Sequence, residues 1–478
     1  MPRYEFQEGT SNKFWEITLD GKSFKTSYGK IGTAGQTTLK SFGDEAEAKA
    51  AYEKLITEKT KKGYKLVGDG AAGATAPAAP KKEKATPAGA ATLDARNEEL
   101  EAAIVKDPTN RQAFSILADW LQDQGDPRGE LISLQLANKE GQAKALIEKR
   151  ADYLLGPLAE HQEVHDEGYN NSRSHLRTKE QEEAWQKVHR QAFLWRHGYI
   201  YRVRLSHDAY SDETFKGKTA DILEAVLEHP SARFAVEFAF QSNGDPNEDD
   251  LQDLIELLGE KAPPTTRKIS FGDNVDQISW HHTGSLANLW KGVPHLRTLE
   301  IETGQFEVGK MVAPELERAI FITGGLSAEC GKGIATAQMP AIKHLEIYYG
   351  TEDYGGTCGV DEVRPLLERD DLKHLEYLGL KNCEFADELA AALPGAKVLQ
   401  GLKTLDLSLG TMSDAGAASL AKAKAYLQHL DCLDLTRNYL TDEGIALVKG
   451  LCKKVITANQ EEGDEDDDEV YRYAAIRE

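Results

Sequence analysis

Apolar and polar residues alternate in a repeating frame near the C-terminus of the chain. In Leu430-Asp431-Cys432-Leu433-Asp434-Leu435, leucines recur between mostly polar positions, and a bend residue, Asn438, and a helical stretch from Thr441 follow. The frame recurs 28 residues earlier and again one unit before that, with leucines at Leu402, Leu405, Leu407, Leu375, Leu378 and Leu380. A short strand points alternate leucines inward, a polar bend residue binds backbone groups, and a helix covers the other side. The pattern therefore predicts stacked strand–turn–helix units around a parallel sheet.

Strand-like alternation continues upstream of these units at irregular spacing. The predicted strands span 342–348, 296–301, 268–271, 234–240 and 201–205. Together with the regular units they would form an irregular solenoid of roughly seven to nine strands, covering residues 201–478. The acidic run 461–469 predicts a solvated loop because it lacks apolar residues. The apolar positions of 470–476 predict a final strand that closes the stack.

The N-terminal pattern is different and predicts a small antiparallel sheet packed by one helix. Alternating runs at 14–19 and 24–32 are separated by Asp20-Gly21, a strong hairpin signal. A further run lies at 37–42. In 44–62, apolar residues occur at helical spacing with acids near the start and lysines at the end, as the helix dipole favours.

Two further segments lie between the sheet and the solenoid. Residues 69–92 are rich in Ala, Pro and Lys with almost nothing bulky to bury, which is typical of a flexible linker. Helical patterns follow at 98–104, 113–124 and 131–137, interrupted by Asp107-Pro108 and Asp126-Pro127. The region up to Arg202 is expected to be a helical cap for the solenoid. The predicted domains are therefore 1–68, 69–92, 93–200 and 201–478.

Three families resemble these segments. The units around Leu433 resemble the leucine-rich repeat of the ribonuclease-inhibitor-like type, in which each repeat carries a full helix. The spelling Ala118-Asp119-Trp120-Leu121 with Gly125-Asp126-Pro127-Arg128-Gly129-Glu130 resembles a bacterial repeat-companion domain that precedes leucine-rich repeats. Phe14-Trp15, Tyr28-Gly29-Lys30-Ile31-Gly32 and Lys59-Thr60-Lys61-Lys62-Gly63-Tyr64 resemble the WGR domain. The overall expectation is a multidomain α/β protein of bacterial origin.

The WGR resemblance implies a role for Tyr28, Gly29 and Lys30. In poly(ADP-ribose) polymerases this domain contacts DNA ends, and here a tyrosine and a lysine replace the tryptophan and arginine of the name-giving triplet. A ring offers a stacking face and a lysine offers a phosphate partner, although without the fork of arginine. The alternative is structural: Tyr28 would be a half-buried strand aromatic, Gly29 a turn residue and Lys30 a solvated charge.

The charge distribution limits where nucleic acid could bind, and the lack of catalytic motifs argues against an enzyme. The chain of 478 residues has a net charge of −22, whereas residues 1–70 hold 12 Lys and Arg against 10 Asp and Glu. Any attraction to nucleic acid would therefore be local to the N-terminal domain. No phosphate loop, nucleophile elbow or dinucleotide fingerprint occurs, and His281 and His282 would point to opposite faces of a strand. We expect no enzyme activity, cofactor or metal, and a soluble, cytoplasmic protein without a membrane segment.

The resulting hypothesis is a non-catalytic adaptor that binds a protein partner. The concave face of the solenoid would present Tyr348, Tyr377, Lys381, Ser408 and Arg437. Tyrosine and arginine often anchor interfaces. The alternative hypothesis is sensing of DNA ends or nicks by the WGR-like domain, relayed to a partner by the solenoid. The sequence does not identify the partner or the oligomeric state.

Overall fold

The computed structural model describes residues 2–8, 11–31, 36–41, 44–61, 64–69, 94–163, 179–180, 190–207, 219–242, 251–272, 278, 281–466 and 469–476. The chain divides into two compact units, Met1–Pro87 and Ala88–Glu478. All but the first residue of the predicted linker 69–92 lies outside the described residues. Each unit is described by itself.

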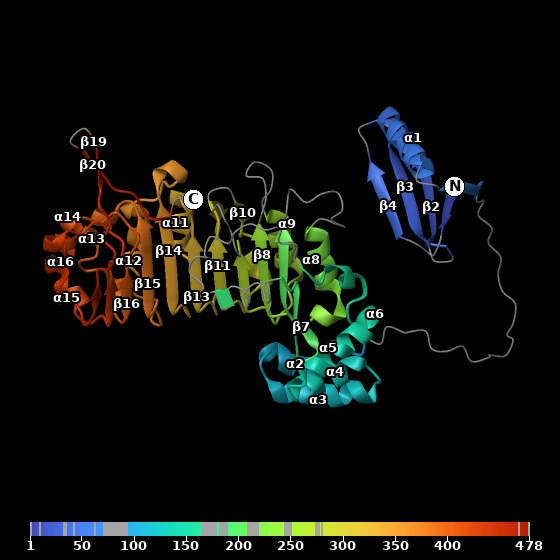
Figure 1. Cartoon of the computed structure of the whole chain (residues 1–478), viewed down its shortest axis with the longest axis horizontal. Coiled ribbons are helices and arrows are strands. Elements are labelled where there is room, and N and C mark those ends of the chain that lie inside the picture. Colours follow the sequence, from blue (N-terminus) through green and yellow to red (C-terminus); the bar gives the residue numbers. More distant parts are fainter. Residues whose placement is uncertain are drawn as a thin grey trace. The chain divides into compact units, whose positions relative to one another are not determined.

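The N-terminal unit is a five-stranded antiparallel sheet in the order β4-β3-β2-β1-β5, packed by one helix (Figure 1). Its elements are β1 Pro2–Glu8, β2 Ser11–Asp20, β3 Ser23–Lys30, β4 Gln36–Ser41, α1 Glu45–Lys61 and β5 Lys65–Asp69. The predicted hairpin is confirmed, and Gly21 in its turn has φ +54°, a conformation that glycine adopts without steric cost. The pattern predicted neither β1 nor β5, the two strands at the other side of the sheet.

Trp15 organises the core of the N-terminal unit. It is 2% exposed, its ring lies 5.4 Å from that of Tyr4, and Ile17 and Phe24 belong to the same buried cluster. Leu55 and Ile56 of α1 pack against this cluster, which is why one face of the helix is apolar. The Nζ atom of Lys59 lies 5.7 Å from the Trp15 ring centroid and adds a cation–π contact at the end of the helix.

The second unit begins with a helical segment. Its helices are α2 Glu98–Lys106, α3 Arg111–Asp123, α4 Pro127–Leu136, α5 Glu140–Lys149, α6 Ala151–Leu154 and the 3-10 helix η1 Gly156–His161. Asn97 and Asn110 cap α2 and α3 through their side chains, and Asp126 caps α4, which starts with a proline as the missing N–H permits. The predicted helices are confirmed, and the breaks fall at the expected prolines.

The motif 125–130 joins this helical segment to the sheet. Arg128 is 2% exposed and donates to the Tyr153 hydroxyl at 2.6 Å and to Ser231 Oγ at 3.2 Å. A Cβ on Gly129 would lie 2.6 Å from the Ala118 carbonyl oxygen, so glycine allows α3 and α4 to approach closely. These residues therefore have a packing role in the structure.

The sheet of the second unit has eleven strands among the described residues, in the order β18-β17-β16-β15-β14-β13-β11-β9-β8-β7-β6 (Figure 1). Its strands are β6 Phe193–Arg196, β7 Tyr199–His207, β8 Glu237–Ser242, β9 Lys268–Phe271, β11 Thr298–Glu302, β13 Arg318–Ile322, β14 His344–Gly350, β15 Tyr377–Cys383, β16 Thr404–Asp406, β17 Cys432–Asp434 and β18 Val455–Ile456. Every pair is parallel except β6–β7. The five predicted upstream strands are confirmed, and the sheet exceeds the seven to nine strands expected.

Two expectations about this sheet were wrong. Residues 193–196 were assigned to a helical cap, but they form β6, because their apolar run pairs antiparallel with β7 across a turn that contains Gly198. Residues 470–476 were expected to close the stack. Instead, β20 Glu469–Tyr471 pairs with β19 Asp464–Asp466 in a separate hairpin, so the acidic run is partly strand and β18 ends the large sheet.

Helices cover one face of the large sheet. They are α8 Thr219–Glu228, α9 Gln252–Lys261, α10 Leu289–Gly292, α11 Ala328–Ala335, α12 Val360–Leu367, α13 Ala386–Ala392, α14 Asp414–Lys422, α15 Lys424–Leu427 and α16 Asp442–Val448. A separate two-stranded parallel sheet is formed by β10 His282–Ser285 and β12 Gln305–Glu307, which precede and follow α10 in the sequence. Alternate strand residues such as Leu345, Leu378 and Leu405 are completely buried in one continuous core. Within the described residues, no helix combines the length and apolar character needed to cross a bilayer.

The bend after β17 is held by the polar side chain of Asn438, as the repeat pattern predicts. Asn438 is completely buried; its amide donates to the carbonyls of Leu407 and Leu435 at 2.9 and 3.1 Å and accepts from Met412 N at 3.0 Å. It thereby pairs backbone groups of two successive repeats that would otherwise be buried without partners.

Candidate binding site on the parallel sheet

The face of the sheet opposite the leucine core carries polar side chains in register. Across β13, β14, β15 and β16, two rows of aligned residues are Arg318, His344, Tyr377 and Thr404, and Ile320, Glu346, Gly379 and Asp406. A third aligned pair is Tyr348 and Lys381. Side chains at alternate strand positions share a face, so these rows form one surface, here called the polar face.

Six side chains of the polar face form a hydrogen-bonded cluster, here called the β14–β16 cluster. Its members are His344, Glu346, Tyr348, Tyr377, Lys381 and Asp406. The Nζ atom of Lys381 lies 3.1 Å from Glu346 Oε1 and 3.2 Å from Asp406 Oδ2. The phenols of Tyr348 and Tyr377 donate to Glu346 at 2.9 Å and to Asp406 at 2.6 Å, respectively. The rings of His344 and Tyr377 stack with centroids 4.1 Å apart.

The charges of this cluster are shielded from solvent and compensate one another. The side chains of Lys381, Glu346 and Asp406 are 13%, 12% and 9% exposed. Burial alone would raise the pKa of Glu346, but hydrogen bonds from His344 and Tyr348 and the charge of Lys381 lower it to about 2. Burial opposes the charge on Lys381, yet the two carboxylates raise its pKa. The ion pairs are therefore fully formed at neutral pH.

Gly379 lies beneath the cluster and leaves room for it. A Cβ at this position would lie 3.1 Å from Glu346 Cγ, 3.2 Å from Lys381 Cδ and 3.2 Å from Tyr377 Cε1. All three distances are shorter than comfortable carbon–carbon contacts, so a side chain here would displace the groups around it. Glycine at this strand position therefore lets the side chains of the β14–β16 cluster pack closely above it.

The five residues predicted to contact a partner have different surroundings. Tyr348, Tyr377 and Lys381 are brought together in the cluster. Ser408 is 5% exposed, and its backbone N–H donates to Asp406 Oδ1 at 2.9 Å. Arg437 lies beyond the end of β17 with φ +53° and forms a 2.9 Å ion pair with Glu461, so it does not belong to the cluster. Partner binding by these residues stays a prediction.

Sequence reasoning missed three members of the cluster: His344, Glu346 and Asp406. Each occupies the same alternating strand position as a residue that was selected, as the register of β14, β15 and β16 makes clear. A period of two applied to Tyr348 and Tyr377 would have identified them. A single carboxylate or histidine carries little signal by itself, because the chain has 79 acidic residues and 13 histidines.

A second charged group extends the polar face toward β9. Glu300 of β11 lies 2.7 Å from Lys268 Nζ and 3.9 Å from the Arg318 Nε atom, and Ser270 Oγ donates to it at 3.2 Å. Lys268 and Arg318 are 36% and 41% exposed, so they are far more accessible than Lys381. The polar face thus combines accessible cations with a shielded, rigid cluster.

The N-terminal unit places the predicted nucleic-acid residues on β3. Tyr28 pairs with Trp15 of β2 and Gln36 of β4, Gly29 pairs with Phe14, and Lys30 pairs with Lys13. The side chains of Tyr28 and Lys30 lie outside the described part of the structure. The backbone therefore establishes that the triplet is in a strand, and its contacts with nucleic acid stay a prediction.

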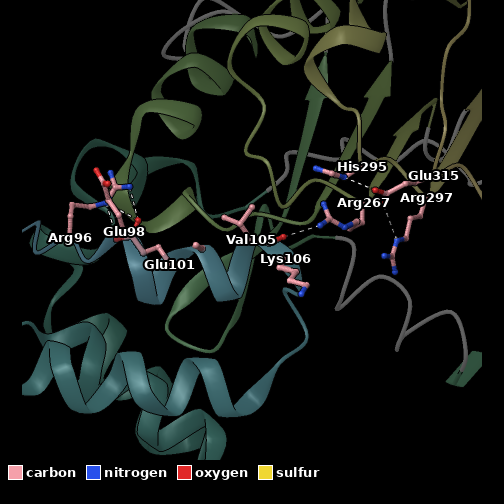
Figure 2. A pocket seen from close by; sticks show the side chains of 10 residues that line it. Arg96, Glu98, Glu101, Val105, Lys106, Arg267, His295, Arg297 and Glu315 are labelled. Carbon is pink, nitrogen blue, oxygen red and sulfur yellow. Dashed lines mark hydrogen bonds and ion pairs between the residues drawn. The ribbon is translucent and has the colours of Figure 1, made fainter.

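A cleft of about 680 Å³ lies between α2 and the loops that precede β9, β11 and β13. Figure 2 shows that Arg267 points to the C-terminal end of α2, where it donates to the Val105 carbonyl at 3.0 Å. His295 and Arg297 converge on Glu315, at 2.7 and 3.7 Å. A cation at a helix C-terminus is favourable, so the contact between Arg267 and Val105 helps to dock α2 onto the solenoid.

The two adjacent histidines lie at the start of β10. His281 is 8% exposed and accepts backbone and Thr303 hydrogen bonds through its carbonyl, while β10 begins at His282. Trp280 lies outside the described residues. Among the described side chains, no three His, Cys, Asp or Glu residues gather closely enough to hold a metal ion.

Family models match segments in the N-terminal and C-terminal parts of the chain. Residues 3–71 match the WGR domain, and residues 400–421 and 426–448 match leucine-rich repeats. The chain carries a WGR domain and leucine-rich repeats. The first match covers β1 to β5, and the second covers α14 and the units around β17. The resemblance of residues 97–137 to a repeat-companion domain stays a prediction.

The curated relatives match parts of the chain. Protein YehF of Escherichia coli is 45% identical over 64 residues, which are 13% of this chain and 23% of YehF. The uncharacterized protein YfeS of the same organism is 40% identical over 62 residues, 13% of this chain and 25% of YfeS. Protein NLRC5 of Ictalurus punctatus is 36% identical over 84 residues, 17% of this chain and 5% of NLRC5. The chain thus spans at most about a quarter of the length of these relatives.

A solved structure is similar over nearly the whole chain. It is the crystal structure of a Bacteroides fragilis protein, which is 20% identical and covers 96% of this chain and 97% of its own length with a TM-score of 0.46. A likeness at this level carries no argument about function.

Proposed function

We propose that this protein is a non-catalytic adaptor whose leucine-rich unit binds a protein partner through the polar face of its sheet. The observation that supports this proposal most directly is the β14–β16 cluster beside the accessible Arg318. Arg318 and the stacked pair His344 and Tyr377 occupy one row across three strands, so an aromatic surface lies next to a cation. Tyrosine and arginine are the side chains that most often dominate interface energies.

The shielded charges beneath this row favour binding because they fix its geometry. Tyr377 is held by its 2.6 Å bond to Asp406, and His344 is held by Glu346 at 3.1 Å. A partner that docks on preordered rings loses little side-chain entropy at the interface. Tyr348, Lys381 and Ser408 then act as positioning residues, whereas Arg318, His344 and Tyr377 make the contacts.

The test compares two charge reversals in the full chain. Arg318→Glu alters the polar face, and the matched control Arg364→Glu alters α12, where Arg364 is 56% exposed. Affinity capture from the native cell, with nuclease treatment, identifies the bound protein, and titration of that purified protein gives its Kd. We expect Arg364→Glu to leave the Kd unchanged and Arg318→Glu to weaken it at least tenfold. Equal affinities of the two variants would place the interface elsewhere.

A second function is supported by the WGR match over residues 3–71. We propose that this domain binds DNA ends or nicks through Tyr28 and Lys30, while the leucine-rich unit engages its partner. With 12 basic and 10 acidic residues in 1–70, binding would be weak and would fall steeply with salt.

Salt-titrated binding of the full chain to blunt and nicked duplexes tests this second function. The double variant Tyr28→Ala with Lys30→Ala is expected to lose most of the binding. Lys65→Ala is the matched control, because Lys65 is an exposed lysine of the same domain on β5. If the double variant binds like the parent chain, the nucleic-acid role fails while the protein-binding role is untouched.

A further inference from the structure

The described end of the chain, residues 472–476, runs across the carboxyl ends of strands in the last repeats. It follows the hairpin β19–β20, which is labelled at the end of the sheet in Figure 1. From there it reaches Tyr439 and Leu409 and then Asn382, which belong to the three successive units of β17, β16 and β15. This end segment, residues 472–476, is called the tail.

The tail is held mainly through its own backbone. Asn382 donates from Nδ2 to the Ile476 carbonyl at 2.7 Å and accepts from Ile476 N at 2.8 Å. The Tyr439 hydroxyl donates to the Tyr473 carbonyl at 3.0 Å and accepts from Tyr473 N at 2.9 Å. Ala475 N donates to the Leu409 carbonyl at 3.0 Å. Five hydrogen bonds thus recognise an extended main chain over four residues.

The receiving surface is built from residues with a left-handed backbone. Asn382 lies near the end of β15, and Leu409 and Arg437 follow β16 and β17. Their φ values are +53°, +68° and +53°. Their N–H groups donate to Ser408, Thr436 and Ala458, each in the next unit. This conformation is unfavourable for leucine and arginine by about 1 kcal/mol each, and such strain is concentrated at functional positions. The backbone carbonyl of Leu409 accepts a hydrogen bond from Ala475 N in the tail.

Two side chains of the tail are also recognised. Ala474 is completely buried, so the surface encloses a small residue at this position. Arg472 lies 3.7 Å from Asp387 Oδ2, a carboxylate that also accepts from Ser413 and Gly416. The chemistry that fits is therefore an extended segment with a basic residue two positions before a small residue.

We propose that Asn382, Asp387, Leu409 and Tyr439 form a peptide-binding groove whose occupant in the resting protein is the tail. An extended segment of a protein partner, with a basic residue two positions before a small residue, binds there after displacing the tail. The groove shares no residue with the β14–β16 cluster, because its ligating groups lie at or beyond the carboxyl ends of the strands. Tethering holds the tail near its groove at an effective concentration of roughly millimolar, so a free peptide competes poorly with it.

The test frees the groove within the full chain. Ala474→Trp cannot fit the buried position, so it releases the tail and leaves the receiving residues unchanged. The probe is a labelled peptide with the sequence of residues 470–478, titrated by fluorescence anisotropy. We expect it to bind the Ala474→Trp chain at least tenfold more tightly than the parent chain. Val470→Trp is the matched control, since Val470 is 60% exposed, and it is expected to behave like the parent.

Further peptide-binding measurements and hydrogen exchange make the outcome decisive. Adding Asn382→Ala to Ala474→Trp is expected to remove peptide binding, and a probe peptide that itself carries Ala474→Trp is expected not to bind. In the parent chain the amides of Tyr473, Ala475 and Ile476 should be protected from hydrogen exchange and should lose protection in Ala474→Trp. Unprotected amides in the parent chain would overturn the proposal. So would peptide binding that is equal in all three chains or insensitive to Asn382→Ala.

Discussion

Replacing Lys381 by methionine tests whether burial makes the β14–β16 cluster a stabilising unit. Lys381 is shared by Glu346 and Asp406 at 3.1 and 3.2 Å. Methionine keeps most of the apolar stem and removes the charge, so both carboxylates lose their cation while they stay shielded. Breaking a buried pair by removing one partner costs about 3–5 kcal/mol.

The lowered pKa of Glu346 gives an independent magnitude. A carboxyl group near 4.3 in the unfolded chain and about 2 in the folded chain corresponds to about 3 kcal/mol of stabilisation at neutral pH. Because the folded pKa is lowered, this stability is fully present above the unfolded pKa and is lost as the pH falls toward 2. The hydrogen bonds from His344 and Tyr348 also lower this pKa and stay in Lys381→Met. The pH-dependent part of the loss in Lys381→Met should therefore be less than about 3 kcal/mol at pH 7 and smaller still at pH 3.

Hydrogen exchange is the appropriate assay because a chain with two compact units need not unfold in one step. Protection of peptides covering β14 to β16, corrected for intrinsic exchange rates, gives the local free energy at pH 7 and pH 3. Lys403→Met is the matched control: Lys403 lies only 2.7 Å from Glu376, but both side chains are 56% exposed. Exposed pairs contribute at most about 1 kcal/mol. Equal losses in the two variants would refute the argument from burial, because distance alone favours the control.

Four other substitutions test the packing of both units. Asn438→Ala should cost about 2–4 kcal/mol, seen as a lower denaturant midpoint, because buried backbone groups of two repeats lose their partner; no change would mean that water replaces the amide. Gly379→Ala should lower stability by about 1–2 kcal/mol, because its Cβ would lie 3.1 Å from Glu346 Cγ. Gly141→Ala in α5 should instead raise stability by about 0.5–1 kcal/mol, because its Cβ meets open space; the reverse order would contradict the contact geometry. Trp15→Ala should cost about 3–5 kcal/mol in the N-terminal unit, measured by exchange of β2 amides, and retained protection there would show that Trp15 is not its core.

The regular repeats could be predicted because their periodicity is local. Leu433 and Leu435 are inward because alternate strand residues share a face, and Asn438 is buried because the bend needs an internal partner. Five of the irregularly spaced upstream strands could also be predicted, because apolar residues still alternate along them although the lengths of the units vary. β13 was missed because its residues, Arg318 to Ile322, follow β11 after an unusually short connection without a helical pattern.

The assignment of residues 193–196 and of the tail failed for a different reason. Both segments have apolar residues at positions compatible with more than one element, and their partners lie far away in sequence. β6 is defined by pairing with β7, and Ile476 is defined by Asn382, 94 residues earlier. Local pattern carries no information about such pairings.

The sequence by itself determined the order of domains, the strand–helix alternation and the inward leucines, because these follow from periods of two, 3.6 and about 28 residues that each segment carries alone. Only the tertiary structure decided which polar residues meet. Glu346, Lys381 and Asp406 come from three strands, and their ion pairs form because parallel pairing in register brings equivalent positions side by side. The course of the tail was likewise decided by hydrogen bonds to a surface that exists only when the repeats are stacked.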